Sequence, residues 1–173
     1  RQMCIRDSCC TMGSNKRESK EEKRKTEQPS DDSCKSYIGT LEESQHRLQA
    51  IFDHGYQFIG LLSPDGILLE ANRSSLKSVG VQKSDVVGQP FWNTPWWSHS
   101  PQLQKRLQRA VARVATGKFD RFEAIHPTRS GDFVHIDFSL SPVKDALGHV
   151  VYLIPEGHDI TDIKHAETLL EQR

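Results

Sequence analysis

The sequence predicts an α+β domain built on a single antiparallel sheet with helices on one face. The first observation is that apolar runs suited to strands are joined by tight turn signals, so consecutive strands pair as antiparallel hairpins. The second is that several short helical segments and one long amphipathic helix lie in the middle of the chain, between two groups of strands. This segregation is typical of domains whose helices cover one face of a sheet.

We expect the first element to be a linker helix over residues 40–55. Thr40 opens a capping-box pattern with the Glu three residues later, in which two side chains bond the free backbone N–H groups of a helix start. Leu41 and Leu48 are at heptad spacing, so they form one apolar seam. Gly55 suits the left-handed position that commonly follows a helix.

A hairpin and a short helix are expected next. Residues 58–62 and 67–71 are apolar runs that flank residues 63–66, Ser-Pro-Asp-Gly, a strong turn with Pro at the second position. Asn72 follows the second run and can accept a hydrogen bond from the backbone of a helix start. We therefore expect Asn72 to cap a short helix that ends at Gly80.

A further helical turn is expected after Ser84, which is placed to cap it, and it ends at Gly88. The clearest helix covers residues 103–114, where apolar side chains recur at i, i+4, i+7, i+8 and i+11. Polar and basic side chains cover its opposite side, and Gly117 ends it. We expect this helix to pack its apolar side against the sheet.

Three strands complete the predicted sheet, over about residues 119–126, 133–143 and 150–155. The loop 128–132 joins the first two as a hairpin. The side chains of the longest run alternate between apolar and polar, as in a strand with one buried face. A final helix is then expected to begin at Asp159.

Two histidines lie close to the predicted hairpin loop. If loop 128–132 closes tightly, His126 and His135 share one face of the sheet. There they form either a weak metal or pH-sensitive site, or two solvent-exposed polar residues opposite the core. The chain has no paired carboxylates, no nucleophile with an adjacent base and no Gly-rich phosphate loop, so we expect no catalytic site and no metal site.

Residues 1–39 are expected to be a disordered tail and linker. Met12 is the single large apolar side chain over most of that length, so the segment cannot bury enough apolar surface to offset its ordering entropy. The chain starts at Arg1 rather than Met, and a helical pattern still continues at Arg173, so we expect an incomplete reading frame. Residues 1–8 resemble a translated sequencing adapter, so the part upstream of Met12 is either native or an artefact.

Charge and hydropathy exclude some classes of partner. Lys and Arg total 23, as do Asp and Glu, so the formal net charge is zero. A neutral chain lacks the overall positive field that attracts nucleic acid or anionic membranes. No run approaches the roughly 18–20 apolar residues that cross a bilayer. We therefore expect a cytoplasmic domain with no nucleic-acid partner and no membrane segment.

Four segments together resemble a known family. Residues 62–72 (LSPDGILLEAN), 87–92 (VGQPFW), 137–145 (DFSLSPVKD) and 159–167 (DITDIKHAE) are similar, in order and separation, to successive motifs of PAS sensor domains that end in a PAC segment. The resemblance runs over residues 41–173. It implies the PAS fold, with about five antiparallel strands and helices on one face.

The resemblance also implies a domain division and a function. Residues 56–158 are the sensor domain, between the linker helix 40–55 and the start of a C-terminal signalling helix at 159–173. The implied function is that of a non-catalytic sensory module in a truncated bacterial signalling protein, most often a sensor histidine kinase of a two-component phosphorelay. The alternatives are a ligand-free domain for protein interaction and dimerisation, or the input domain of a cyclic-di-GMP signalling enzyme.

A ligand cavity would draw on Phe58, Trp92, Trp96, Trp97 and Phe138. Aromatic side chains offer a planar ligand a large apolar contact area, but they also fill cores or cover core edges. We expect the second role for at least two of the three tryptophans. Because Trp96 and Trp97 are adjacent, we expect that they do not both face inward. A collapsed cavity would favour the ligand-free alternative.

Asp159 and Thr161 are the expected signal-relay residues, because short polar side chains bond neighbouring backbone groups at a helix start. The helix that follows either continues as a parallel coiled coil into an effector domain or packs back on the sheet. In the first case the two flanking helices hold a homodimer, and the effector lies beyond this fragment. The heptad positions of the C-terminal helix are Ile163, Ala166 and Leu170.

The cofactor stays unknown, although two types can be set aside. All four cysteines precede residue 35, so the folded domain has no thiol for a cysteine–flavin adduct or a covalent bilin. Haem-binding PAS domains use a His on the long helix, and residues 103–114 contain none, with His99 lying just before them. A small organic ligand, or no ligand, is therefore expected.

Overall fold

The computed structural model describes residues 31–171, with side chains from residue 39 onward. The part of the described chain from Thr40 onward forms one compact unit. The strands are β1 (Phe58–Leu62), β2 (Leu68–Ala71), β3 (Asp120–Pro127), β4 (Phe133–Lys144) and β5 (Val150–Asp159). The helices are α1 (Asp31–His54), α2 (Arg73–Val79), α3 (Lys83–Val86), the 3-10 turn η1 (Phe91–Asn93), α4 (Pro101–Val114) and α5 (Thr161–Glu171).

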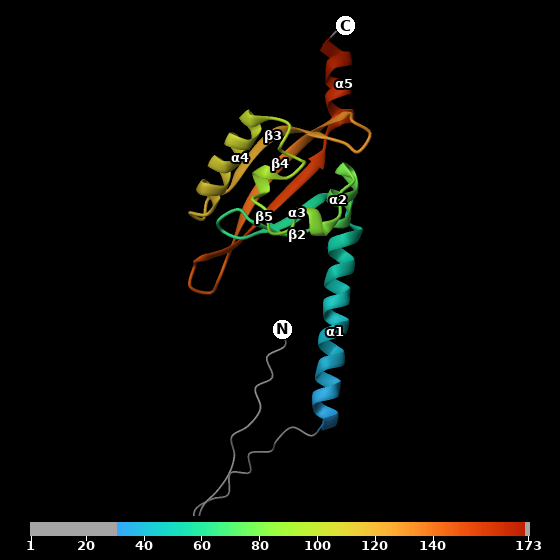
Figure 1. The fold of residues 1–173 in the computed structure, drawn as a ribbon, viewed down its shortest axis with the longest axis vertical. Helices are drawn as coiled ribbons and strands as arrows, with labels where there is room; N and C mark the ends of the chain where they lie inside the picture. The colour runs from blue at the N-terminus through green and yellow to red at the C-terminus, as the bar shows by residue number, and fades with distance from the viewer. Residues whose placement is uncertain (1–30, 172–173) are drawn as a thin grey trace, which may run out of the picture. The chain divides into compact units, whose positions relative to one another are not determined.

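The five strands form one antiparallel sheet in the order β2-β1-β5-β4-β3 (Figure 1). Helix α2 contacts β1, α3 contacts β2, and α4 contacts β3 and β4. The predicted α+β class, with a single antiparallel sheet, is confirmed. β5 comes last among the strands in sequence but lies in the middle of the sheet, so it contacts both the β1–β2 hairpin and the β3–β4 hairpin.

Alternation along the strands decides which side chains reach the core. On β4, Ile136, Phe138 and Leu140 are at most 2% exposed, and the residues between them point to the outer face because successive side chains of a strand alternate. The apolar side of α4 packs on this inner face, as its periodicity predicted. Its buried residues are Leu107, Ala110, Val111 and Val114.

Helix α1 begins earlier than predicted, at Asp31 rather than Thr40. No proline interrupts the chain between Asp31 and Thr40. Each further helical residue adds one backbone hydrogen bond, so the helix continues without a break across this segment. Leu41 and Leu48 are 57% and 65% exposed. Residues 1–30, which hold most of the predicted tail, lie outside the described residues.

Two further boundaries differ from the prediction. The N-cap of α3 is Gln82, not Ser84, because the Asp85 carboxylate accepts a hydrogen bond from the Gln82 N–H at 2.9 Å, which leaves Ser84 inside the helix. β5 continues past Pro155 to Asp159. Pro155 has no N–H group to donate to a neighbouring strand. The strand continues nevertheless, because β1 pairs with the residues before and after this proline.

His126 and His135 lie on opposite faces of the β3–β4 hairpin, so the prediction of a shared face is wrong. His126 stands opposite Val134, and His135 stands opposite Ile125. Directly opposite residues share a face, and His135 is one position removed from the partner of His126. His126 is 6% exposed on the inner face, whereas His135 is exposed on the outer face. Both predicted alternatives, a shared site and a pair of exposed residues, are therefore wrong.

Candidate functional site

A small cavity lies between the inner face of the sheet and the segment that follows α3. Its volume is about 30 Å³, which exceeds the roughly 10–15 Å³ that one water needs but falls below the roughly 300–1,000 Å³ of ligand pockets. Its wall is mostly apolar. The large side chains of the wall include Phe58, Phe91, Trp96 and Phe138.

Three of the five predicted ligand-binding residues line this cavity. Phe58 reaches it from β1, Phe138 from β4, and Trp96 from the turn before α4. Trp97 lies deeper, 0% exposed, with its ring centroid 4.9 Å from that of Phe138. Trp92 covers the β1–β2 turn instead. A Cβ added at Gly66 of that turn would lie 2.6 Å from the Trp92 ring.

Trp96 and Trp97 are both buried, 4% and 0% exposed, so the expectation that they do not both face inward is wrong. They lie in a tight turn rather than in a strand, whose successive side chains would point to opposite sides. The backbone N–H of Trp97 donates to the Thr94 carbonyl at 3.0 Å, and the Thr94 hydroxyl donates to the Phe91 carbonyl at 2.6 Å. The Trp96 indole N–H donates to the Ser75 carbonyl at 3.2 Å.

His126 is a cavity residue that the sequence-based prediction placed wrongly. It projects from β3 into the cavity wall, and its two ring nitrogens have no hydrogen-bond partner. Burial lowers the pKa of His126 to about 3, and the neighbouring His99 adds to this effect. Burial also lowers the pKa of His99, which the backbone of Ile125 and Trp96 partly opposes. The imidazole of His126 is therefore neutral near pH 7.

Asn72 joins the end of α1 to the sheet. It is 0% exposed, and its amide donates to the carbonyls of Gln57 and Phe52 at 2.8 and 3.2 Å. Its side-chain oxygen accepts from the backbone N–H groups of Ile59 and Ser75 at 3.2 and 3.0 Å. The predicted cap of α2 is confirmed, and the same side chain also fixes where the N-terminal helix meets β1.

Asp159 and Thr161 hold the start of α5 against β4. The Asp159 carboxylate accepts from the Thr161 N–H at 2.9 Å and from its hydroxyl at 2.6 Å. The Thr161 hydroxyl oxygen in turn accepts from the His135 N–H at 2.9 Å. The Ile160 N–H donates to the His135 carbonyl at 2.8 Å. The two predicted relay residues thus form one connected junction between β5, α5 and β4.

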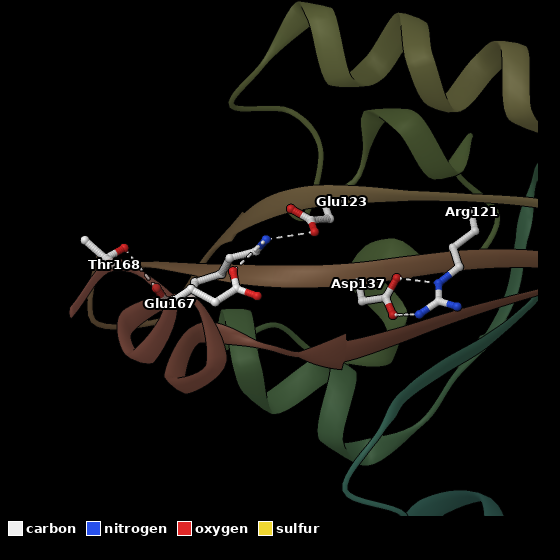
Figure 2. Close-up of polar contacts among 6 residues, drawn as sticks. Arg121, Glu123, Asp137, Glu167 and Thr168 are labelled. Carbon is white, nitrogen blue, oxygen red and sulfur yellow. Dashed lines mark hydrogen bonds and ion pairs between the residues drawn. The ribbon is translucent and has the colours of Figure 1, made fainter. Parts of the chain in front are cut away.

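Ion pairs extend this junction on the outer face. Lys164 of α5 pairs with Glu123 of β3 at 2.9 Å and with Glu167 one turn on at 3.4 Å. Figure 2 shows Glu123 directed toward α5 and, farther along the strands, the Arg121–Asp137 pair. Hydrogen bonding to Glu123 is the main cause that raises the pKa of Lys164. Helix α5 is therefore tied to β3 as well as to β4.

Helix α5 has no buried residue among those described. Ile163 and Leu170 are 57% and 72% exposed. This exposure argues against the alternative in which the C-terminal helix packs back on the sheet.

Within residues 31–171 no cluster of three or more His, Cys, Asp or Glu side chains is placed to hold a metal ion. None of the helices in this range combines the length and apolar character needed to cross a membrane.

The fold and the site together define a class of protein. A five-stranded antiparallel sheet lines a small, mostly apolar cavity on its inner face, and polar junctions at Asn72 and Asp159 connect the sheet to one helix at each end of the domain. A domain with an interior cavity and anchored terminal helices has the parts of a sensor module. The comparisons with known proteins identify which family of sensors it is.

The sequence matches the PAS fold family over residues 52–165. It is 38% identical over 122 residues to the sensor histidine kinase TmoS of Ectopseudomonas mendocina, which covers 69% of this chain and 12% of that protein. It is 31% identical over 140 residues to hybrid signal transduction histidine kinase D of Dictyostelium discoideum, or 80% of this chain and 9% of that protein. The chain thus spans a small part of these two relatives.

A solved structure shows the same fold. The PAS domain of an HTR-like protein from Haloarcula marismortui superimposes with a TM-score of 0.60 at 21% identity, over 73% of this chain and 99% of that one. The chain therefore belongs to the PAS fold family. Its homology to the PAS regions of signalling proteins identifies it as a signalling input module.

Proposed function

We propose that this chain is the input module of a sensor histidine kinase, and that it reports the state of its inner cavity through helix α5. The two histidine kinases similar to it over most of its length support this assignment. The output enzyme would belong to the remainder of a longer protein, and the module itself would contribute no catalytic group. The alternative output, a cyclic-di-GMP signalling enzyme, stays a prediction.

One observation carries the proposal: the cavity and the helix junction are built on the same two strands. On β5, Gly157 lines the cavity, and Asp159, two positions farther on, holds α5. On β4, Phe138 lines the cavity, and the backbone of His135 bonds Thr161. A change in the cavity that moves β4 relative to β5 would therefore alter the hydrogen bonds that set the direction of α5.

The flanking helices support a second part of the proposal, a cytoplasmic homodimer in which the PAC segment leads into a coiled coil. Leu41 and Leu48 on α1, and Ile163 and Leu170 on α5, stand seven residues apart and are exposed. Apolar residues at this spacing bury their side chains when two helices associate. Such an arrangement would carry a change at the junction into the helices of an attached kinase.

A chimera tests the proposed direction of signalling. Residues 40–173 would replace the input domain of a histidine kinase, and autophosphorylation would be compared for the unmodified chimera and Asp159→Ala. We expect Asp159→Ala to change the autophosphorylation rate at least about threefold, because it removes two hydrogen bonds from the α5 junction. Asp65→Ala, in the β1–β2 turn, is the matched control. Equal rates for all three proteins would overturn the proposal.

The volume of the cavity favours a second candidate, a ligand-free interaction domain. About 30 Å³ is roughly a tenth of the smallest ordinary ligand pocket, so in this conformation the cavity holds no more than water-sized contents. Sedimentation equilibrium separates the candidates when combined with a ligand screen. A dimer that binds nothing favours the interaction domain, and a ligand that alters the exchange of α5 amides favours the sensor.

A further inference from the structure

The solvent side of helix α4 carries a row of positive side chains. Lys105, Arg109 and Arg113 stand four residues apart and are exposed. Residues at this spacing are neighbours on one side of a helix, about 6 Å apart along its axis at 1.5 Å per residue. We call these three residues the basic stripe. The opposite side of α4 is buried against the sheet.

The basic stripe has no negative partner within the described part of the chain. None of its three residues takes part in an ion pair there. The remaining cation of α4 is paired, because Arg106 contacts the buried Asp120 at 2.5 Å and lies over the ring of Phe122 at 4.2 Å. The contacts of the fold therefore use Arg106 and leave the stripe free.

The stability of α4 does not explain the basic stripe. Like charges at i, i+4 destabilise a helix, and α4 contains no Asp or Glu that could offset them. The helix dipole favours cations in the last turn, where Arg113 stands. It gives no such reason for Lys105 and Arg109, which lie earlier in the helix. An uncompensated row of this kind is suited to a negatively charged partner.

The surroundings of the basic stripe disfavour nucleic acids and membranes. The major groove of DNA admits a helix, but α4 cannot enter it because one side is covered by the sheet. Single strands need aromatic stacking platforms, and α4 contains no aromatic residue. Amphipathic helices bind membranes through large apolar side chains. The exposed residues beside the stripe are instead small or polar, namely Gln102, Gln108, Ala112 and Thr116.

An acidic helix of another protein fits both the charge and the spacing of the basic stripe. Glu side chains at i, i+4 and i+8 repeat at the same interval of about 6 Å, so three ion pairs can form in register. Arginine also binds a carboxylate through two parallel hydrogen bonds. Nowhere in this sequence do three Asp or Glu residues stand at that spacing. A second copy of the chain therefore lacks the matching helix.

We propose that the basic stripe of α4 is a docking surface for an acidic helix of a separate partner protein. The partner helix lies along α4 and pairs its carboxylates with Lys105, Arg109 and Arg113. This surface is distinct from the inner cavity and from the exposed apolar residues of α1 and α5. The proposal does not depend on the signalling role of the domain.

Two short alanine-rich helical peptides test the charge preference. One carries Glu at three positions four residues apart, and the other carries Gln at the same positions. Calorimetric titration of the whole 173-residue chain at about 0.05 M salt should show the Glu peptide binding at least about tenfold more tightly. The preference should vanish at about 1 M salt, where exposed charges are screened. Equal affinities at low salt would overturn the proposal.

Matched double variants locate the surface. Arg109→Gln/Arg113→Gln should weaken binding of the Glu peptide at least about fivefold, since it removes two of the three ion pairs. Arg73→Gln/Lys77→Gln is the control, because it removes two exposed cations at i, i+4 from α2 and changes the net charge equally. It should weaken binding less than about twofold. Losses of equal size in the two variants would refute a site on α4.

A readout on the unmodified chain does not require either variant to fold. Backbone amide NMR signals of α4 should shift when the Glu peptide is added, and those of α2 should stay in place. Unshifted α4 signals at saturating peptide would overturn the proposal. A single-stranded oligonucleotide or a phosphatidylserine vesicle that bound α4 more tightly than the Glu peptide would overturn the choice of partner. Sedimentation should show the same self-association for Arg109→Gln/Arg113→Gln as for the unmodified chain, whereas a loss would assign the stripe to a second copy.

Discussion

The inner and outer faces of this sheet are made by alternating residues of the same strands, yet they hold the molecule together in different ways. On β4, Phe138 is 2% exposed and packs among aromatic rings. Its neighbour Asp137 points the other way and pairs with Arg121. Apolar burial stabilises by about 25 cal/mol per Å², whereas exposed ion pairs contribute about 0–1 kcal/mol.

This difference assigns folding stability to the inner face and the positioning of the signalling helix α5 to the outer face. The inner face supplies most of the folding free energy and encloses the cavity, while the outer face and the end of β5 position α5 through polar contacts. Substitutions on the inner face should therefore change global unfolding. Substitutions at the junction should change α5 and leave the sheet folded. The predictions below test this division, from the largest expected effect to the smallest.

Trp97→Ala should have the largest effect. Its side chain is 0% exposed and contacts the rings of Phe91, Phe122 and Phe138, so its removal leaves a large internal void. We expect a loss of about 3–5 kcal/mol in the free energy of unfolding, measured by urea denaturation. Tyr152→Ala on the outer face, 43% exposed, should cost less than about 1 kcal/mol. Similar losses for both variants would contradict the division between the faces.

Asn72→Ala should follow in size. The substitution leaves the carbonyls of Phe52 and Gln57 and the N–H groups of Ile59 and Ser75 without their side-chain partner. Buried groups left unpaired cost about 1–3 kcal/mol, so we expect a loss of about 2–3 kcal/mol in urea denaturation.

The exposed Asn93→Ala provides the control for Asn72 and should stay within about 0.5 kcal/mol of the unmodified chain. Hydrogen exchange should also show the end of α1 opening faster in Asn72→Ala. A stable variant with unaltered exchange in α1 would mean that Asn72 only caps α2.

The pH dependence of stability tests the burial of His126. The pKa of His126 is about 3 in the folded chain and about 6.5 when unfolded, so above pH 6.5 neither state binds the proton. As the pH falls from about 6.5 toward 3, the unfolded chain alone becomes protonated and the free energy of unfolding decreases. For one such group the loss between pH 6.5 and pH 5 is about 1.5 kcal/mol.

His126→Phe should remove this contribution and flatten the acid limb of the stability curve, measured by urea denaturation at a series of pH values. His149→Phe should keep the slope of the unmodified chain. The lowered pKa of His99 adds a contribution of the same sign, which both variants retain. An acid limb in His126→Phe as steep as in the unmodified chain would show that His126 is hydrated.

Local signals in the sequence predicted most of the fold correctly. Asn72 before a helical pattern and Gly66 in the first turn act on their neighbours in the chain, so their roles can be read without the tertiary structure. The helix 103–114 shows its buried side as a periodicity. Pro155 was misleading as the end of the last strand, because whether a proline suits a central strand depends on the register of the strand beside it.

The candidate site was less predictable, because it depends on register and on the shape of a turn. One position of register decides that His126 faces the cavity and His135 the solvent. A turn that directs Trp96 and Trp97 inward together depends on the Thr94 hydrogen bonds, for which the sequence offers no periodic pattern. Asp159 was predictable, since its bonds to Thr161 are local.

Thr161→Val should give a smaller effect, confined to α5. The isosteric change removes the hydroxyl that accepts from the His135 N–H and donates to Asp159. We expect a loss of about 1 kcal/mol, seen as faster hydrogen exchange in residues 162–168 with an unchanged urea midpoint for the sheet. Thr168→Val, whose hydroxyl bonds only the Lys164 carbonyl within α5, is the control. Equal effects of the two variants would argue that no junction forms at Thr161.

Lys164→Met should have the smallest effect, and the dependence of this effect on salt matters more than its size. The pair with Glu123 lies on the outer face, where Glu123 is 60% exposed, so salt screens it strongly. We expect no measurable change in urea denaturation. Exchange of the α5 amides should become faster at low salt and match that of the unmodified chain at about 1 M salt, where the Debye length is only about 3 Å.

Lys83→Met, which breaks the pair with Glu70 at the other edge of the sheet, is the control for Lys164 and should leave α5 unchanged. A difference in α5 exchange that persists at high salt would mean that Lys164 acts through packing of its aliphatic stem rather than through charge. In that case the outer face would hold α5 by the same kind of contact that stabilises the inner face, and the division between stability and output would disappear at this position.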